Sequence, residues 1–550
     1  MTTTLFAVDR ADGAAPFKVS LVVPTHNTGD TVLTGLRSFY AQTMPHTDFE
    51  VVYVDDGSTD DTVAVIEAEV ERLGAGPPVR VLRIENSGWP GRPRNVGTDA
   101  ARGEFVHYVD DDDWLAPEAL ERVYARAVET GADIVAGRMA GHGRRAPRAV
   151  FAKPIASWDI RSDPKRKMLG TMTVHKLFRR SFLEQHGLRF EEGEVRLEDH
   201  MFTLRAYLRT DRIATVHDYT CYHWVKHNGG GSGGGGKRNI SYGVPPRPYV
   251  QSVRTVLGIL DDPEYGIEDD VQRHNLASRW YGNKALERLT GKLFLDQSEE
   301  RRVEWFDAVS ALASEQPPEA DAALPPRLRI AAALARHGDR QLAEEHARFE
   351  AGLTHRPKVV ATEWQDGSLT VRCSTRLVSK PRKRAAAVPA VFEHSRAEDR
   401  YELKLAPGVE AVPGARAAAD FTEPVRRSSV GAVLRHREGG TELDLDTTCR
   451  RVEVPLRKDL AGGGLAGRLP SWLKSRIPAA RRASRQCSLR YEVGFTVDPA
   501  TADQGRPLAP GTWEVRLRLN VGGWRLVRVL PDLTVDVPEA GRATAEVRAA

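Results

Sequence analysis

The first third of the chain alternates short apolar runs with longer amphipathic stretches. The apolar runs are rich in Val, Ile and aromatic residues, which predicts strands, and the stretches between them have the apolar spacing of helices. Such alternation is typical of an α/β fold in which crossover helices join parallel strands. The predicted strands cover residues 18–23, 50–54, 79–84, 105–109 and 133–136, and the predicted helices cover residues 31–42, 62–73 and 117–130.

The rest of the chain changes pattern twice. From about Tyr249 to Glu350 the apolar spacing is helical, whereas after Thr354 short alternating segments are bounded by Gly, Pro and Asp. The later pattern predicts a β-sandwich, or two small ones. The predicted β segments include residues 368–373, 401–405, 451–454, 489–495 and 512–519.

We therefore expect three parts in the chain. Within the first part, Asn228 to Gly236 reads NGGGSGGGG, which is either a natural mobile loop or an engineered linker. The expected parts are a catalytic domain over residues 1–248, a helical linker over 249–354 and a β-sandwich region over 355–550 that serves oligomerisation or polymer binding.

Composition and charge exclude several classes of protein. The 550 residues are 41% hydrophobic and 28% charged, which is typical of a globular protein. A net charge of +4 over this length does not favour nucleic-acid binding as the main activity. The four cysteines are far apart and form no C-x-x-C pair, which fits a reducing cytoplasm, and neither a secretion signal nor a membrane-spanning apolar run is found. We expect a cytoplasmic protein.

Polar residues follow the first two predicted strands, in VVPTHNTGDT and VVYVDDGSTDDT. Ligands of open α/β folds bind at this carboxyl edge of the sheet. Asp56, or its neighbour Asp55, could accept a hydrogen bond from the NH of a uracil ring. An ordinary turn followed by a helix cap would explain the same residue types at positions 55–61. The chain has neither G-x-G-x-x-G after the first strand nor a P-loop, so a dehydrogenase and a P-loop NTPase lose support.

Four consecutive carboxylates, Asp110 to Asp113, follow the apolar strand FVHYV. Their mutual repulsion would be costly without a cation, and oxygen ligands favour Mg²⁺ or Mn²⁺. The alternative is a solvated acidic turn.

Two further segments carry candidate chemistry. Arg92 and Arg94 lie in the Gly/Pro-rich stretch ENSGWPGRPRN, which we expect to be a loop, and a guanidinium group suits phosphate oxygens. Glu198, Asp199 and His200 precede an apolar helical segment, where an acidic pair is also an ordinary helix start.

Taken in order along residues 18–227, these motifs resemble the inverting glycosyltransferases of family 2, which have a GT-A fold. The resemblance implies that Asp56 holds uracil, that Asp110 and Asp112 form the D-x-D pair with Asp112 as the principal metal ligand, and that Asp199, beside Glu198, is the general base. The nucleotide-sugar-binding residues it implies are Pro24, Thr25, Asn27, Asp55, Asp56, Asn86, Arg94, Asp110 and Asp111.

SGWPGRPRNVG and GHGRRAPRAVF are similar to stretches of the poly(ribitol-phosphate) N-acetylglucosaminyltransferases that decorate wall teichoic acid. This closer resemblance implies a UDP-sugar donor, an anionic polyol-phosphate acceptor and a homo-oligomer, with a trimer as the leading expectation. Trp89 and the Gly-rich stretch depart from that family. The candidates for contact with the acceptor or the diphosphate are Arg144, His200, His223 and Lys226.

The expected reaction is a single metal-dependent displacement that inverts the anomeric carbon and forms no covalent intermediate. Three alternatives stay open. The enzyme could act on another cell-surface polysaccharide or a glycolipid, it could be a nucleotidyltransferase, or it could be a carbohydrate-binding protein with weak or no catalysis.

One segment falls outside these motifs. Leu465 to Gln486 carries six basic residues and no acidic one, interleaved with Leu469, Trp472 and Ile477. It could lie on the inner leaflet of the membrane as a peripheral contact, bind acceptor phosphates, or be a solvated loop.

Overall fold

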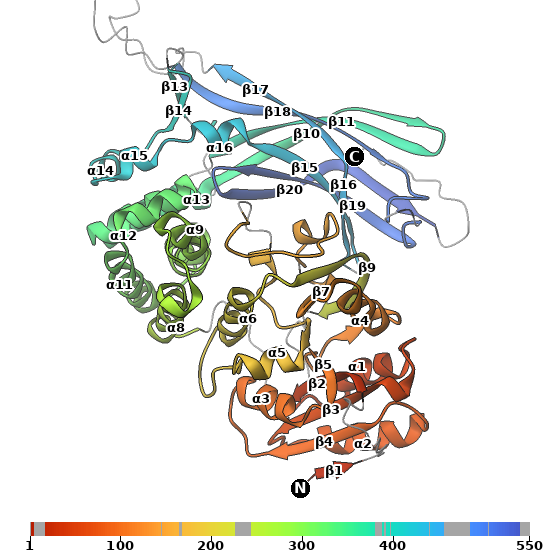
Figure 1. The fold of residues 1–550 in the computed structure, drawn as a ribbon. Helices are drawn as coiled ribbons and strands as arrows, with labels where there is room; N and C mark the ends of the chain where they lie inside the picture. Colours follow the sequence, from red (N-terminus) through yellow and green to blue (C-terminus); the bar gives the residue numbers. More distant parts are fainter. Residues whose placement is uncertain are drawn as a thin grey trace, which may run out of the picture. The chain divides into compact units, whose positions relative to one another are not determined.

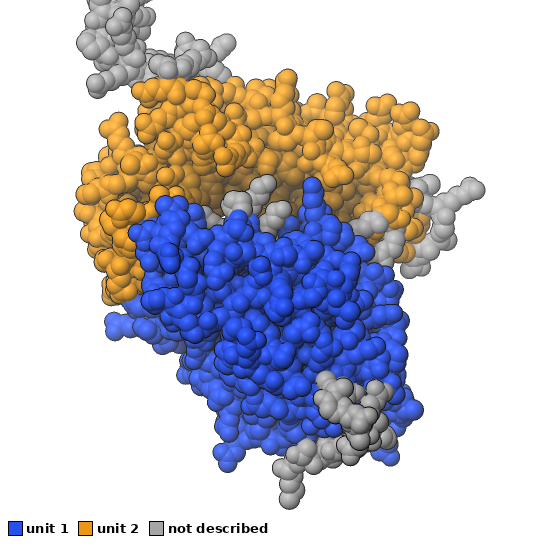
Figure 2. All heavy atoms as spheres, viewed as in Figure 1, with its two compact units in different colours: residues 1–280 blue, residues 281–550 orange. Residues whose placement is uncertain are grey.

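The structure is a computed structural model. It describes residues 2–4, 17–144, 146–163, 168–225, 244–379, 388–389, 392–395, 398–438, 440–455, 485–503, 505 and 507–538. The chain forms two compact units, Met1–Trp280 and Tyr281–Ala550 (Figure 2), and the three expected parts stay a prediction. The Gly-rich stretch and nearly all of the basic segment lie outside the described residues. Among the described helices, none is long and apolar enough to cross a membrane.

The first unit is built on one mixed sheet (Figure 1). Its strand order is β1-β4-β3-β2-β5-β8-β7-β9-β6, and β2 lies parallel to both β3 and β5. The chain order reverses at β2, so the carboxyl ends of β2, β3 and β5 form the edge at which such sheets bind ligands. The strands are β1 (Thr2–Thr4), β2 (Phe17–Thr25), β3 (Phe49–Asp56), β4 (Val79–Ile84), β5 (Gly103–Tyr108), β6 (Trp114–Leu115), β7 (Ile134–His142), β8 (Leu177–Arg179) and β9 (Ile213–Val225).

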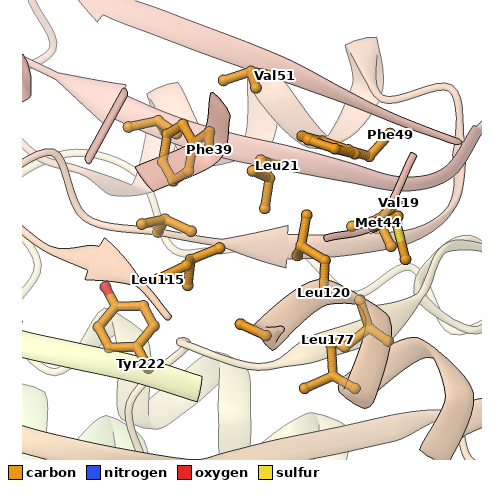
Figure 3. Packing of buried hydrophobic residues seen from close by; sticks show 14 of the residues in the cluster. Val19, Leu21, Phe39, Met44, Phe49, Val51, Leu115, Leu120, Leu177 and Tyr222 are labelled. Atoms are coloured by element: carbon orange, nitrogen blue, oxygen red, sulfur yellow. The ribbon is translucent and has the colours of Figure 1, made fainter. Parts of the chain in front are cut away.

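Helices flank this sheet and bury its apolar side chains. Leu21 of the sheet lies in one buried cluster with Phe39 and Leu120, which come from the first and fourth helices (Figure 3). The α/β fold class is therefore confirmed. The helices of the unit are α1 (Val32–Tyr40), α2 (Thr62–Leu73), α3 (Gly91–Ala100), α4 (Ala119–Thr130), α5 (Arg180–Gln185), α6 (Glu198–Arg209), α8 (Pro246–Asp261) and α9 (Asp270–Trp280).

Helix α3 corrects one expectation, because Arg92 and Arg94 lie on a helix and not in a loop. Pro93 is the third residue of α3, where a missing N–H leaves no hydrogen bond unmade. Gly97 is needed for close packing, since a Cβ atom there would clash with Val22 of β2. The Gly and Pro residues that suggested a loop therefore serve a helix start and a tight helix–sheet contact.

The second unit begins with helices and ends in two sheets, so the expected helical linker and strand-rich C-terminal region are confirmed. One sheet has the order β10-β11-β18-β13-β14, with β12 on β11 and β17 on β18, and the other has the order β16-β15-β19-β20. Its helices are α10 (Gly291–Leu295), α11 (Glu299–Glu315), α12 (Pro326–His337), α13 (Arg340–Gly352), α14 (Pro407–Glu410), α15 (Ala415–Ala418) and α16 (Thr422–Arg426). Its strands are β10 (Leu353–Gln365), β11 (Ser368–Ser379), β12 (Val388–Pro389), β13 (Phe392–Ser395), β14 (Arg400–Leu403), β15 (Ser429–His436), β16 (Glu442–Leu445), β17 (Thr447–Pro455), β18 (Arg485–Val497), β19 (Gly511–Val521) and β20 (Trp524–Val537).

Candidate active site

Hydrogen bonds link the loop after β2 to the loop after β3. Pro24 and Thr25 close β2 where it runs beside β3. The following loop turns at Asn27, whose φ of 49° lies in the left-handed region that asparagine tolerates. The side-chain oxygen of Asn27 accepts hydrogen bonds from the backbone N–H groups of Thr59 (2.8 Å) and Asp60 (3.3 Å). The two predicted nucleotide-binding loops thus form one hydrogen-bonded unit.

Asp55 and Asp56 end β3, and both are buried. The Asp56 carboxylate accepts hydrogen bonds from the backbone N–H (2.9 Å) and the hydroxyl group (3.0 Å) of Ser87. Oδ2 of Asp55 lies 3.6 Å from Arg83 Nε, whereas its Oδ1 is buried without a hydrogen-bond partner among the described residues. The choice between these two carboxylates for uracil stays a prediction.

His26 is a member of this group that the sequence analysis did not single out. Its Nδ1 lies 2.8 Å from the backbone oxygen of Asp56, and the amide nitrogen of Asn86 lies 3.2 Å from both of its ring nitrogens. His26 therefore connects the loops after β2, β3 and β4. Its place inside the PTHN motif is the signal that could have found it.

The acidic cluster follows β5, and its members have different surroundings. Oδ2 of Asp111 accepts a hydrogen bond from the Thr28 hydroxyl group. Asp113 is buried, and its carboxylate accepts hydrogen bonds from the Tyr222 hydroxyl group and from the backbone N–H of Val225, each at 2.7 Å. Burial, and then the charge of Asp110, raise the pKa of Asp113 to about 8. Burial and neighbouring negative charge both disfavour an ionised carboxylate at this position.

The residues present fit a divalent cation. Asp110, Asp113 and His175 offer ligand atoms that all lie within 4.8 Å of one another. His175 is buried, its Nε2 lies 3.1 Å from Asp110 Oδ2, and neither ring nitrogen has an aligned hydrogen-bond partner in the described part of the chain. Two carboxylates and an imidazole suit Mn²⁺, and they suit Mg²⁺ less well. Asp112 lies in the same turn, and its part as principal ligand stays a prediction.

Arg94 joins the acidic cluster to the start of α6. Its Nη2 donates a hydrogen bond to Asp110 Oδ1 (3.0 Å), and its Nη1 donates one to Glu198 Oε1 (3.1 Å). Burial alone would lower the pKa of Arg94, but the charges of Asp110 and Glu198 raise it above its usual value. Glu198, 104 residues from Arg94 in the sequence, therefore shares this buried guanidinium group with Asp110.

Glu198 and Asp199 occupy the first turn of α6. The residue before them, Leu197, has a φ of 63°, a left-handed conformation that costs a leucine roughly 1–2 kcal/mol. Burial, and then the charge of Asp199, raise the pKa of Glu198 to about 7. Such strain and perturbed pKa values are concentrated at functional sites.

The acceptor candidates are placed differently. His200 is buried, and its Nδ1 accepts a hydrogen bond from Trp280 Nε1 (3.0 Å). His223 stacks on Trp114, with ring centroids 4.9 Å apart. Burial, and then the charge of His142, lower the pKa of His223 to about 4, which favours a neutral imidazole near pH 7. Lys226 lies outside the described residues.

Arg144 is an exposed cation on this edge. Its guanidinium carbon lies 3.1 Å from the centroid of the Trp224 ring, and its charge faces those of Asp110, Asp112 and Asp113. Trp89, the departure noted in the sequence, lies beneath the guanidinium group of Arg196 at 4.9 Å.

Two family models match the chain. Residues 20–187 match the glycosyl transferase family 2 model, and residues 246–347 match the linker domain of the glycosyl transferase TarS. The first range contains the loops after β2, β3 and β5, and the second contains α8 to α12 and the first part of α13. The resemblance expected from the motifs is confirmed.

Relatives and solved structures agree with this assignment. A poly(ribitol-phosphate) beta-glucosyltransferase of Bacillus spizizenii is 29% identical over 341 residues, which cover 61% of this chain and 51% of the relative. The poly(ribitol-phosphate) beta-N-acetylglucosaminyltransferase TarS of Staphylococcus aureus strain Mu50 is 30% identical over 321 residues, which cover 57% and 52%. The chain thus spans about half the length of these curated relatives. A crystal structure of S. aureus TarS 1–349 in complex with UDP-GlcNAc matches with a TM-score of 0.53 at 25% identity, covering 68% of this chain and 99% of that chain.

Proposed function

We propose that this chain, in which residues 20–187 are a family 2 glycosyltransferase domain, transfers a sugar from a UDP-sugar to a hydroxyl group of a polyol-phosphate cell-wall polymer such as poly(ribitol-phosphate). One observation carries the proposal. Arg94 joins Asp110, beside the nucleotide loops, to Glu198, next to the candidate base Asp199. The candidate residues for donor binding, metal binding and base catalysis therefore lie at one edge of one sheet.

The donor is proposed to be UDP-GlcNAc, with UDP-glucose as the alternative. The names of the two relatives specify different sugars, and the matching crystal structure contains UDP-GlcNAc. Both names specify a β-linked product, which one inverting displacement on an α-linked nucleotide sugar would give.

In the proposed mechanism Asp199 accepts the proton of the acceptor hydroxyl group while that oxygen attacks the anomeric carbon. Asp110, Asp113 and His175, together with Asp112, would hold Mg²⁺ or Mn²⁺. A bound divalent ion would supply positive charge for the leaving diphosphate. Arg144, whose charge faces the same acidic cluster, would add to it.

The cellular location, the oligomeric state and the membrane contact of the enzyme stay predictions. A cytoplasmic location fits the cysteine pattern, and the homo-oligomer, the trimer and the contact with the inner membrane leaflet await experiment.

The test measures UDP release from UDP-GlcNAc and from UDP-glucose, with Mn²⁺, with and without a ribitol-phosphate polymer. We expect polymer-dependent UDP release and a β-linked product by NMR. UDP release no greater than that of a reaction without enzyme, for either donor, would overturn the proposed activity. UDP release that only a different polysaccharide stimulates would overturn the proposed acceptor.

A further inference from the structure

Helix α9 ends against the first turn of α6. Trp280, the last residue of α9, is fully buried, and its Nε1 donates a hydrogen bond to His200 Nδ1 at 3.0 Å. The two rings meet edge to face, with centroids 6.2 Å apart. His200 in turn donates its backbone N–H to Asp199 Oδ1 at 2.8 Å. Trp280 therefore fixes the residue whose backbone holds the candidate base.

The residue before it, Arg279, carries a charge that interacts with that of Asp199. Its side chain is largely buried, and its Nε has no hydrogen-bond partner among the described residues. Burial lowers the pKa of Arg279, and the charges of Asp199 and Tyr207 oppose this effect. Asp199 and Tyr207 both belong to α6. Arg279 thus lies close enough to α6 for its charge to act on the candidate base.

Other charged groups face Asp199 from other elements. Glu198 is its neighbour on α6, and the charges of Arg94 on α3 and of Lys176 before β8 also act on it. Arg94 already donates to Asp110 and Glu198, and Lys176 donates to the backbone oxygen of Thr173. Arg279 is therefore a further positive charge, supplied from a separate element of the fold.

We propose that α9 is a positioning element for the candidate base. Trp280 fixes the first turn of α6 through His200, and Arg279, the preceding residue of α9, adds a permanent positive charge to the surroundings of Asp199. Helix α9 lies outside residues 20–187 and inside residues 246–347, so the linker region takes part in the chemistry of the catalytic domain. This inference rests on the proposed function, because it assigns Asp199 the role of base.

The charge of Arg279 is tested by the pH dependence of kcat. A nearby cation favours the ionised carboxylate, so Arg279→Gln moves the acid limb of the profile to higher pH. Arg279→Lys keeps the charge and leaves the limb near its wild-type position. Above the limb, kcat of Arg279→Gln recovers to within about twofold of wild type, which a variant with a damaged fold would not do.

The matched control is Arg273→Gln on the same helix, because Arg273 pairs with Asp261 and Asp270 and not with α6. It should leave the profile unchanged. Donor hydrolysis, in which water is the acceptor, separates base positioning from binding of acceptor phosphates. If Arg279→Gln raised only the KM for a phosphate-bearing acceptor and left the acid limb in place, the inference would be overturned.

A second measurement needs no turnover, so it stays informative if the proposed activity fails. Indole N–H only donates, so His200 must carry its proton on Nε2. Spectra of the ligand-free protein with ¹⁵N-labelled histidine should show this tautomer, and Trp280→Phe should shift the Nδ1 resonance. An unshifted resonance would overturn the positioning role, whereas an inactive wild type with the expected shift would overturn only the proposed function.

Discussion

Nη2 of Arg94 lies 3.0 Å from Oδ1 of Asp110, and both atoms belong to residues directly at the carboxyl edge of the sheet. Arg94 is only 6% exposed, so this is a charge pair shielded from water on the arginine side. Its other terminal nitrogen is bound to Glu198. The guanidinium group therefore fixes the distance between the acidic cluster after β5 and the acidic pair that begins α6.

Replacing this cation should damage both stability and activity. Arg94→Gln leaves Asp110 and Glu198 without their shared partner, and breaking a buried pair in this way costs about 3–5 kcal/mol of unfolding free energy. Arg94→Lys keeps the charge but loses the planar fork that reaches both carboxylates, so we expect it to recover only part of the loss. Urea unfolding at pH 7 measures the first effect and UDP release the second.

Arg92→Gln is the matched control, because Arg92 lies on the same helix and is exposed. It should change stability by no more than about 0.5 kcal/mol. Wild-type stability and activity in Arg94→Lys would show that the bridge between the two motifs is dispensable.

Asp199→Asn should lower kcat by roughly 100-fold or more, since it removes the general base and keeps the shape of the side chain. Binding of the UDP-sugar should stay close to wild type, which calorimetry can measure. Glu194→Gln, at an exposed position five residues earlier, is the control. A near-normal kcat in Asp199→Asn would remove this residue from the mechanism.

Much of the fold could be predicted from the chain, because the strands of a doubly covered sheet are continuous apolar runs. The run before Asp55 and the helix that starts near Thr62 were placed within two residues of their observed bounds. Helix α3 differs from the expected loop because Pro93 serves its first turn and Gly97 serves close packing against Val22, a constraint that only the folded sheet reveals.

The site was predictable where its residues follow a strand, and not where the fold brings in a distant residue. His175 precedes a three-residue strand, and nothing in its neighbours sets it apart from a core histidine. Its place beside Asp110, 65 residues away in the chain, depends on the antiparallel pairing of β8 with β5. Trp280 and Arg279 reach α6 from the linker for the same reason.

Removal of the divalent ion by exhaustive EDTA treatment should abolish activity, and Mn²⁺ should restore it. Asp112→Ala should be inactive, as the sequence predicts. His175→Ala tests the candidate metal ligand that only the structure identified. It should weaken Mn²⁺ binding, which electron paramagnetic resonance can measure. His186→Ala, at the end of α5, is the control. Unchanged Mn²⁺ binding in His175→Ala would remove this imidazole from the set of ligands, and full activity after EDTA treatment would refute the metal requirement.

Lys176 should make stability depend on pH above neutrality. It is fully buried, and burial lowers its pKa to about 7 in the folded chain, against 10.5 for an ordinary lysine. Between these values the unfolded chain binds more protons, so stability rises with pH through this window and is insensitive to Lys176 below it. The full effect is at most about 5 kcal/mol.

Lys176→Met should therefore be more stable than wild type at pH 7, and the difference should shrink as the pH approaches 10. Urea unfolding from pH 6 to pH 10 measures both chains, and Lys153→Met, at an exposed position, is the control. A difference that stays constant across this range would mean that Lys176 does not titrate on folding.

A chain that ends at Gly352 tests the role of the C-terminal sheets, because β10 begins at the next residue. We expect it to form a smaller assembly, or to lose activity on long polymers and keep it on short acceptors. The truncation also removes Trp524, whose Nε1 donates a 3.0 Å hydrogen bond to Glu350 at the end of α13. Trp524→Phe is therefore the matched control, since it removes this bond and keeps the sheets. If light scattering and activity on both acceptors matched the full chain, neither oligomerisation nor polymer capture would belong to this region.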